Sequence, residues 1–593
     1  MKTLLLLGML AILSGCSVAP EKPQHLNKGD FSYLNAYVDW ALAEKRRQHD
    51  IAAVSVVVLD SNKIIASHHS GMANREEDTP ASDNTLYRIG SVTKLFTAVS
   101  ILQLVDSGKI ALDAPLQQYL PQLNLQSDFD ADSVTVRQVL SHHSGLPSDI
   151  WNGFADSEAL DQLIPLLNEQ YLSYAPGEVF SYSNVGYALL GLVIEEVSGR
   201  TYPDYLKENV FTPLGLKHAI VGVDDKNLAQ AYRKLDAHSY PQIRDTAAGD
   251  IAMSARDLAT FAQVMLRDGE YQDQKGQVQR LVSPGAFNQM VTPQNSQSHL
   301  YKDMPMGLAW FLFYPRPALS GKTVRWHGGA THYFHSSLIT LPSEDLAVVV
   351  LANSAEAYES VTEIAEQTTR LAYEAKTGQR WPTPSQSEAE RMTLSPQKQQ
   401  YLSGRYISPA LGEIQVTVQN GQLIASNKEG EVALIPYADG TLGVEYKALV
   451  FFSFDNSFFA QLRLIPMEYQ GQIVIKEQNG GVVAQKYSLS TLPEQWKRKL
   501  GSYTHNNPDK LYKFSEIKLE ESHGILQLTL FNEINGYQQI LYFNPTSKDR
   551  AVNIGLTRSS GDSLQVIQDN TASINNKSAS LRYLGMQFQQ HLE

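Results

Sequence analysis

The sequence predicts an α+β domain, in which one antiparallel sheet is flanked by helices, followed by two small β-barrels. Predicted strands stand at both ends of the first 380 residues with helices between them, which indicates a sheet assembled from both ends. Beyond residue 400 the chain alternates apolar and polar residues, the pattern of half-buried strands. This part also repeats, because YLSGRY at 401–406 is echoed by KLGSY at 499–503.

Length and composition limit the class of protein. A chain of 593 residues exceeds what one hydrophobic core usually supports, so several domains are expected. With 43% hydrophobic and 19% charged residues, the chain has the composition of a globular protein. Its net charge of -13 argues against a nucleic-acid-binding surface, which needs clustered Lys and Arg, so no nucleic-acid partner is expected.

The first 15 residues have the composition of a secretory signal peptide, and their apolar run is too short to span a membrane. Leu13-Ser14-Gly15-Cys16 resembles the lipobox of bacterial lipoproteins, and Cys16 is the only cysteine in the chain. The resemblance implies lipidation of Cys16 and anchoring to the bacterial cell envelope; Ser17 favours the outer membrane, facing the periplasm. An unprocessed signal with an incidental cysteine is the alternative. Residues 16–30 then form a tether.

Residues 31–380 are predicted to be the first domain. Strands are expected at 54–59 and 63–67, and again at 308–313, 322–329, 336–341 and 346–353. Helices are expected at 31–47, 91–105, 255–267 and 359–376, and residues 175–199 are expected to form a turn that leads into a further apolar helix. Residues 381–400, rich in Pro, Ser and Gln, are predicted to be a linker. The repeat then places one barrel at 401–495 and a second at 496–593.

Ser91 is the candidate nucleophile. It opens a helix that is apolar on nearly every side and therefore buried, and Lys94 follows one turn later on the same face. A partly desolvated lysine can take the proton of a serine hydroxyl. The alternative is that Ser91 only caps the helix and Lys94 is solvated, since Ser-x-x-Lys also occurs at 395–398 and 515–518.

Two further patterns complete a candidate site. Tyr182-Ser183-Asn184 offers a phenol for proton transfer and an amide to hold a substrate, and His327-Gly328-Gly329-Ala330 offers a strand that substrate can approach closely. The N–H groups of Ser91 and Ala330 would form an oxyanion hole. Each triplet recurs: Tyr-x-Asn at 33 and 542, His-x-Gly at 69 and 143. Taken in the order Ser-x-x-Lys, Tyr-x-Asn, His-x-Gly, the chain offers only the set at 91, 182 and 327.

These motifs resemble those of serine β-lactamases and penicillin-binding proteins of the class C type, a group that includes D-alanyl-D-alanine carboxypeptidases, D-aminopeptidases and esterases. The resemblance covers residues 31–379 through YRIGSVTKLFTA, LSHHSGLP, PGEVFSYSNVGYALLG, SARDLATF, MGLAW and HGG. It implies a β-lactamase/transpeptidase-like fold with an all-helical region. It also implies that Ser91 is acylated, that Lys94 and Tyr182 share the proton transfers, and that Asn184 and His327-Gly328-Gly329 bind substrate.

Three local features qualify the resemblance. Lys-Thr-Gly, the third motif of many relatives, occurs at 376–378, but it is not assigned to the site because it lies at the end of a predicted helix. Tyr333 stands where many relatives have glycine and is expected either to narrow the acyl pocket or to alter the end of the strand. His327 stands where many have lysine, and Arg325 on the same strand is expected to supply the missing positive charge.

The sequence therefore predicts a serine hydrolase that needs no cofactor and no metal. The expected substrates are small peptides, amides, esters or β-lactams, and two following barrels favour a peptidase because D-aminopeptidases of this group are similar in that respect. The alternative is a catalytically silent envelope protein that binds peptidoglycan fragments or a protein partner. The sequence does not indicate the oligomeric state.

Overall fold

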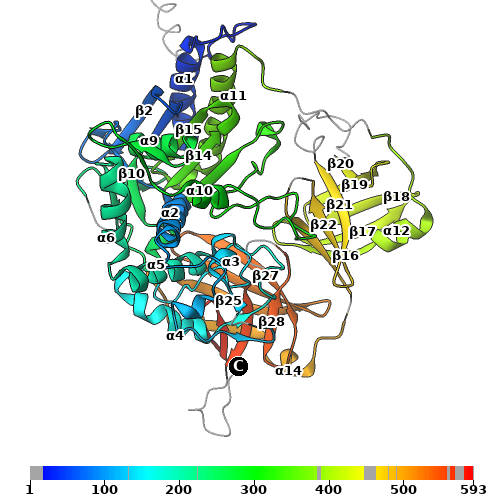
Figure 1. Cartoon of the computed structure of the whole chain (residues 1–593). Helices are drawn as coiled ribbons and strands as arrows, with labels where there is room; N and C mark the ends of the chain where they lie inside the picture. Colours follow the sequence, from blue (N-terminus) through cyan, green and yellow to red (C-terminus); the bar gives the residue numbers. More distant parts are fainter. Residues whose placement is uncertain are drawn as a thin grey trace, which may run out of the picture.

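The structure is a computed structural model that describes residues 18–591 except 131–132, 223–224, 383–388, 447–461, 479, 489, 557–560 and 568–579. Cys16 and the predicted signal peptide lie outside the described residues. The expected fold class is confirmed, since an α/β domain is followed by two closed eight-stranded antiparallel barrels (Figure 1).

A six-stranded antiparallel sheet forms one half of the N-terminal domain, in the order β13-β14-β15-β1-β2-β3. Strand β1 pairs with β15 at the centre, with Val56 opposite Val350, so the sheet is assembled from both ends of the domain as expected. The strands are β1 Ala53–Leu59, β2 Ile64–Asn74, β3 Thr79–Pro80, β13 Arg325–Ala330, β14 His335–Leu341 and β15 Leu346–Ala352.

Both faces of this sheet are covered by helices, which explains why β1, β14 and β15 are buried throughout and why β1 and β15 are almost entirely apolar. Val56 and Val58 pack with helices α1 and α11 on one face, while Val57 and Leu59 face α9 and the helical half on the other (Figure 1). The helices are α1 Ser32–His49, α9 Ala255–Leu266 and α11 Tyr358–Thr377.

The second half of the domain is mostly helical and is built around α2, whose residues are almost all buried. Its neighbours pack apolar side chains against α2 in one continuous core. The elements that carry or support the site are β4 Leu86–Arg88, the 3-10 turn η1 Gly90–Val92, α2 Thr93–Asp106, α3 Val136–Leu140, α4 Leu163–Asn168, α5 Asn184–Ser198, α6 Tyr202–Leu206, α8 Thr246–Gly249, β10 Ile251–Ser254 and α10 Pro284–Met290.

One predicted strand is wrong. Residues 308–313 form no strand; Phe311 makes only isolated bridges, to Met306 and Trp326. Ala309 adopts a left-handed conformation with φ 67°, which ends any extended run, and its N–H donates to the Leu140 carbonyl 3.0 Å away. The segment is apolar because it is a buried loop, and composition alone does not distinguish a buried loop from a short strand.

The first barrel comprises β16 Gly404–Ser408, β17 Gly412–Gln419, β18 Gln422–Asn427, β19 Gly430–Pro436, β20 Leu442–Tyr446, β21 Arg463–Tyr469, β22 Gln472–Glu477 and β23 Val482–Tyr487. The second comprises β24 Gly501–His505, β25 Phe514–Ser522, β26 Ile525–Asn532, β27 Tyr537–Pro545, β28 Arg550–Asn553, β29 Ser563–Ile567, β30 Ser580–Tyr583 and β31 Met586–Gln590. The repeated tyrosines are equivalent, since Tyr406 and Tyr503 each donate to the carbonyl four residues earlier.

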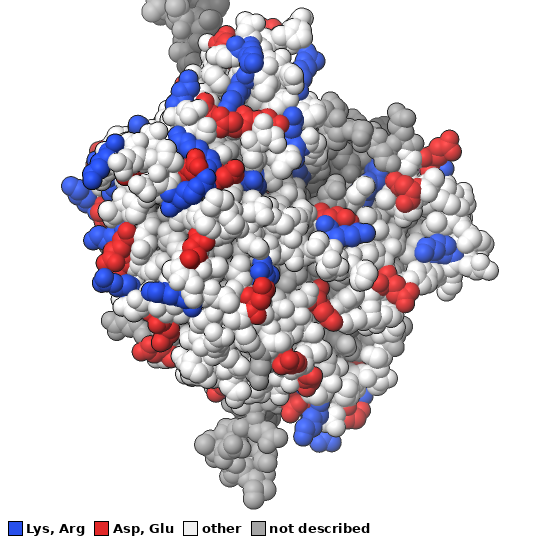
Figure 2. All heavy atoms as spheres, viewed as in Figure 1, with Lys and Arg blue, Asp and Glu red and all other residues white. Residues whose placement is uncertain are grey.

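Two expectations from the sequence concern the charge of the surface and the length and hydrophobicity of the helices. On the face shown in Figure 2, acidic and basic side chains are interspersed. Among the described residues no helix is long and apolar enough to cross a bilayer.

Candidate active site

Ser91 is presented by a sharp backbone turn between β4 and α2. Gly90 has φ 52°, and a Cβ placed there would lie 2.8 Å from the Ala330 nitrogen, so this glycine allows β13 to approach the nucleophile closely. Ser91 is not the N-cap of α2, because it lies inside the 3-10 turn η1 and Val92 occupies the cap position without a side-chain cap. The capping alternative for Ser91 is therefore not supported.

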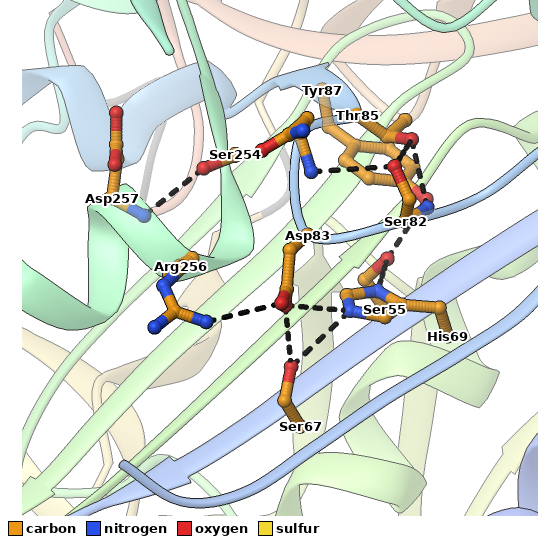
Figure 3. A network of polar contacts seen from close by, with 11 residues as sticks. Ser55, Ser67, His69, Ser82, Asp83, Thr85, Tyr87, Ser254, Arg256 and Asp257 are labelled. Carbon is orange, nitrogen blue, oxygen red and sulfur yellow. Dashed lines mark hydrogen bonds and ion pairs between the residues drawn. The ribbon is translucent and has the colours of Figure 1, made fainter. Parts of the chain in front are cut away.

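A polar network holds the segment before Ser91 against the sheet (Figure 3). His69 contacts the Ser55 hydroxyl through Nδ1 and the Asp83 carboxylate through Nε2, each at 2.9 Å, and Ser55 also contacts the Tyr87 hydroxyl at 2.9 Å. Arg256 completes the network by donating to Asp83. Ser55 is fully buried, so this Ser-His-Asp arrangement cannot attack a substrate and acts as a support. It accounts for one of the alternative His-x-Gly patterns.

Lys94 lies at the centre of the predicted site. Its buried Nζ is 3.3 Å from Ser91 Oγ, 2.7 Å from Asn184 Oδ1 and 2.8 Å from the Ala248 carbonyl oxygen. The last two atoms can only accept hydrogen bonds. In its unprotonated form the amine has two N–H donors and one lone pair, so donation to these two acceptors leaves the lone pair available to the Ser91 hydroxyl.

The turn at 182–184 is fixed by the loop that precedes it in the chain. Ser183 caps α5 by accepting from the Gly186 N–H at 2.9 Å, and its own hydroxyl donates to the Pro147 carbonyl. The Tyr182 ring stacks on His142 with centroids 4.2 Å apart, and Lys94 Nζ lies 4.9 Å from the Tyr182 centroid. This packing holds the phenol in the cavity beside the nucleophile.

Asn184 joins Lys94 to a carboxylate that no sequence motif indicated. Its Nδ2 donates to Asp149 Oδ1 at 2.7 Å, which fixes Oδ1 as the atom facing Lys94. Its backbone N–H donates to the Ser148 carbonyl at 2.8 Å. The loop at 148–149 therefore sets both the position and the orientation of the amide.

Strand β13 lies across the nucleophile and needs glycine at its closest point. A Cβ on Gly329 would be 2.0 Å from the Ile89 carbonyl and 2.3 Å from Ser336 Oγ. The imidazole of His327 lies 2.7 Å from the Gly328 carbonyl through Nδ1, so Nδ1 carries the proton and Nε2 presents a lone pair. Burial lowers the pKa of His327 to about 3, and the charge that Lys94 carries when it is protonated acts in the same direction. His327 is therefore neutral and supplies no positive charge.

The three predicted stretches meet at one cavity of about 490 Å³. Ser91, Tyr182, Asn184 and the His327 to Ala330 strand all line it, and Lys94 lies beneath it. The sequence analysis missed several further lining residues because they belong to no motif. They include Asp149, Arg233, Tyr240 and Asp245 of the N-terminal domain and Tyr512 and Asn535 of the second barrel.

Two expectations about neighbours of the site are not supported. Arg325 is not among the described residues that line the cavity, and its guanidinium lies over the Phe287 ring. Among the described lining residues the cation is Arg233, whose Nη1 donates to the Asn535 carbonyl. Tyr333 does not narrow the cavity; it is buried and stacks on His238, and Arg233 lies over its ring.

Comparison with known proteins identifies the family. A family model described as Beta-lactamase matches residues 38–372, more than half of the chain. The chain belongs to the beta-lactamase family. Its first domain is the family domain, which confirms the expected kinship with serine β-lactamases and penicillin-binding proteins. The D-aminopeptidase-like architecture stays a prediction.

The chain is similar to several known members and structures. It is 25% identical to Protein flp of Staphylococcus aureus strain MW2 over 333 residues, 53% of this chain and 62% of that protein, so it spans about three fifths of that relative. It is 30% identical to penicillin-binding protein 4* of Bacillus subtilis strain 168 over 198 residues, 32% of this chain and 42% of the relative. The crystal structure of SurE shares its fold, at 23% identity and TM-score 0.52, covering 77% of this chain and 99% of SurE.

The second barrel lies against the helical part of the beta-lactamase family domain (Figure 1). Asp562 is fully buried, and its carboxylate accepts from the Ser148 N–H at 2.7 Å, the Ser148 hydroxyl at 3.0 Å and the Tyr583 hydroxyl at 3.3 Å. Gly561 packs so closely that a Cβ there would be 2.3 Å from the Leu146 carbonyl. Since Ser148 holds Asn184, the barrel helps to position the candidate site.

The remaining motif copies have structural roles. Ser395 caps helix α12 (Pro396–Leu402) by accepting from the Lys398 N–H, and Ser515 and Lys518 lie on strand β25. Lys376 to Gly378 closes α11, with Gly378 in a left-handed C-cap, as the helix-end interpretation predicted. The described residues contain no group of three or more His, Cys, Asp or Glu side chains arranged to hold a metal ion.

Proposed function

We propose that this protein is a serine hydrolase that forms an acyl-enzyme on Ser91 and cleaves short peptides or amino acid amides, as D-aminopeptidases and D-Ala-D-Ala carboxypeptidases do. Esters and β-lactams are further acyl donors for the same site. The observation that carries the proposal is the contact of Lys94 with both Ser91 and Asn184 at the floor of a cavity that also holds Tyr182 and His327.

The first step uses Lys94 as the base. Its lone pair takes the proton of Ser91 while Oγ bonds to the substrate carbonyl carbon, and the N–H groups of Ser91 and Ala330 stabilise the negative oxygen that develops. Tyr182 then delivers a proton to the departing amine as its bond to carbon breaks, with Lys94 as the source. Water releases the acyl group by the same route in reverse.

The shape and charge of the cavity support a short substrate with a carboxylate or carbonyl end. Tyr512 and Asn535 of the second barrel close one side of the cavity, which limits how far a chain can extend. Arg233 is the cation on the wall, and a guanidinium pairs with a carboxylate through two parallel hydrogen bonds. The neutral His327 adds no charge to this wall, and its Nε2 is buried without a hydrogen-bond partner among the described residues.

A covalent probe tests the proposal. A fluorescent penicillin and a fluorophosphonate are expected to label the wild type, to leave Ser91→Ala unlabelled, and to label Ser395→Ala fully, because that serine belongs to the same motif but only caps a helix. Labelling that survives in Ser91→Ala would remove Ser91 as the nucleophile. No labelling of the wild type by either probe, with retained binding of peptidoglycan fragments, would favour the silent binding protein.

The substrate class is read from a panel of D- and L-aminoacyl amides, D-Ala-D-Ala peptides, short-chain esters and nitrocefin. Turnover of the amides or peptides at least tenfold above the chromogenic β-lactam is expected for a peptidase. Preferential turnover of nitrocefin would assign the protein to β-lactam hydrolysis instead.

The membrane anchor is part of the proposal. The lipobox-like stretch ending at Cys16 supports lipidation and attachment to the outer membrane, with the enzyme facing the periplasm. Cys16→Ala is expected to move the protein from the membrane fraction to the soluble fraction after cell lysis. Retention of this variant in the membrane fraction would refute the anchor.

A further inference from the structure

The two barrels share a topology but differ inside. The second is filled by large buried side chains, including Trp496, Phe514 and Phe588. The first encloses a cavity of about 930 Å³. An eight-stranded barrel is just wide enough either to be filled by side chains or to hold one small ligand. The second barrel is filled by side chains, whereas the first has room for a small ligand.

The wall of this cavity is aliphatic. Ile414, Val444, Leu464 and Ile475 line it and remain only partly buried, although they pack on the core cluster of the barrel. Apolar side chains that face an open cavity keep apolar surface in contact with water, and a ligand that covers them removes that surface. Cavities with apolar walls are the ones that take up apolar molecules.

The cavity has a closed end and a rim. Because successive antiparallel strands alternate in direction, the connections β16–β17, β18–β19, β20–β21 and β22–β23 all lie at the same end of the barrel. Residues 447–461 of the β20–β21 connection are not described. Cavity-lining residues at that end include Leu411 and three carboxylates, Glu429, Glu431 and Glu477. At the opposite end Leu402 of α12 is buried, and its carbonyl accepts from the Tyr406 hydroxyl. The described residues therefore form a cup-shaped cavity with carboxylates at its rim.

The rim selects the polar end of a ligand. Among the described lining residues there is no Lys, Arg or His, so nothing in that set would pair with the carboxylate of a fatty acid. Glu429 and Glu431 are exposed at the rim, whereas Glu477 is half-buried there, and burial raises its pKa. A cationic or hydroxyl head would complement these carboxylates.

We propose that the first barrel binds a long aliphatic chain with an amine or hydroxyl head, inserted tail first so that the head lies among Glu429, Glu431 and Glu477. This site is separate from the candidate active site and does not depend on the proposed hydrolase function. The connection at 447–461 is not described and forms no part of the proposed site.

The test uses the full chain and N-phenyl-1-naphthylamine, an uncharged dye that fluoresces in apolar cavities. One dye is expected to bind per chain, and dodecylamine and dodecanol below their aggregation concentrations are expected to displace it at least tenfold more strongly than dodecanoate. No saturable dye binding by the wild type would overturn the proposal. Equal competition by dodecanoate would overturn the assignment of the head group.

Two variants locate the site. Ala425→Phe adds a ring to the cavity wall and is expected to weaken dye binding at least tenfold, whereas Thr417→Phe, on a neighbouring position that does not line the cavity, is expected to stay within twofold. Unchanged labelling by the penicillin probe and an unchanged circular dichroism spectrum show that both variants are folded. Dye binding by Ala425→Phe equal to the wild type would refute this location.

The head-group assignment has its own variant. Glu477→Lys is expected to make dodecanoate compete at least tenfold better, because it places a cation at the rim. An unchanged ranking of the three competitors would refute a role for Glu477.

Discussion

Asp562 of the second barrel is a buried carboxylate whose titration should be measurable as a change in stability. Burial raises its pKa from the ordinary value of 3.8 to about 7, and the nearby Asp149 adds to the effect while the donors of Ser148 oppose it. Replacing it by Asn keeps an oxygen for the Ser148 N–H and removes the titrating proton.

The sign follows from proton binding. Between pH 3.8 and 7 the folded chain keeps a proton on Asp562 that the unfolded chain has lost, so the stability contributed by this group falls as pH rises. Each pH unit in that interval costs about 1.36 kcal/mol. From pH 5.5 to 7 the loss is about 2 kcal/mol, and above pH 7 it levels off because both states are ionised.

The assay compares free energies of unfolding in urea for the wild type and Asp562→Asn at several pH values between 5.5 and 8.5. Other titrating groups are common to both proteins and cancel, so the wild type should lose about 2 kcal/mol relative to the variant over this range. The control is Asp509→Asn, which removes a partly exposed carboxylate that accepts from the Ala155 N–H at the same interface. A wild-type-minus-Asn difference that stays constant within about 0.5 kcal/mol would refute the reasoning.

Three further predictions address the site. Gly329→Ala is expected to slow acylation by the penicillin probe at least 100-fold, because its Cβ meets backbone, while Gly328→Ala meets only a tryptophan ring and should cost less; equal rates would contradict this. Asn184→Ala is expected to lower the acylation rate by about two to three orders of magnitude in stopped-flow measurements, because Lys94 loses the amide oxygen that holds its amine in place. A change below threefold would exclude this role of Asn184. Burial lowers the pKa of His143 to about 4 and of His327 to about 3. Each histidine should therefore lower the free energy of unfolding in urea by about 2 kcal/mol as the pH falls from 6.5 to 5. In His143→Gln this loss of stability should be smaller by about 2 kcal/mol, the contribution of one histidine.

The fold was predictable where the local pattern and the burial agree. Strands β1 and β15 are long, apolar and β-branched, so their sequence indicates buried strands whatever the rest of the chain does. The segment 308–313 is similarly apolar, yet the left-handed backbone of Ala309 makes it a loop. Alanine does not indicate a left-handed conformation, so the sequence could not predict this loop. The barrels were predictable from alternation and repetition, whereas the space inside the first barrel depends on how the wall side chains meet.

Only those residues of the site that belong to recognisable sequence motifs could be predicted from the sequence. Ser91, Tyr182 and His327 carry local patterns, and their order along the chain selected them from several copies. Asp149 and Arg233 have no such pattern, because their roles come from the cavity they line rather than from their neighbours in sequence. The role of His327 also differs from that of the lysine found in many relatives, since a neutral imidazole carries no positive charge where an ammonium would.

The contacts of Asp562 change how the second barrel should be regarded. Its carboxylate meets Ser148 across 414 residues of sequence, and Ser148 in turn holds the amide that contacts the candidate base. A domain joined only by a linker would leave that amide unchanged if it were removed, but here the two Ser148 donors would lose the carboxylate that accepts from them. The second barrel is therefore part of the structure that positions Asn184 beside the candidate base Lys94. The first barrel has a separate proposed role, since its cavity is proposed to bind an aliphatic ligand.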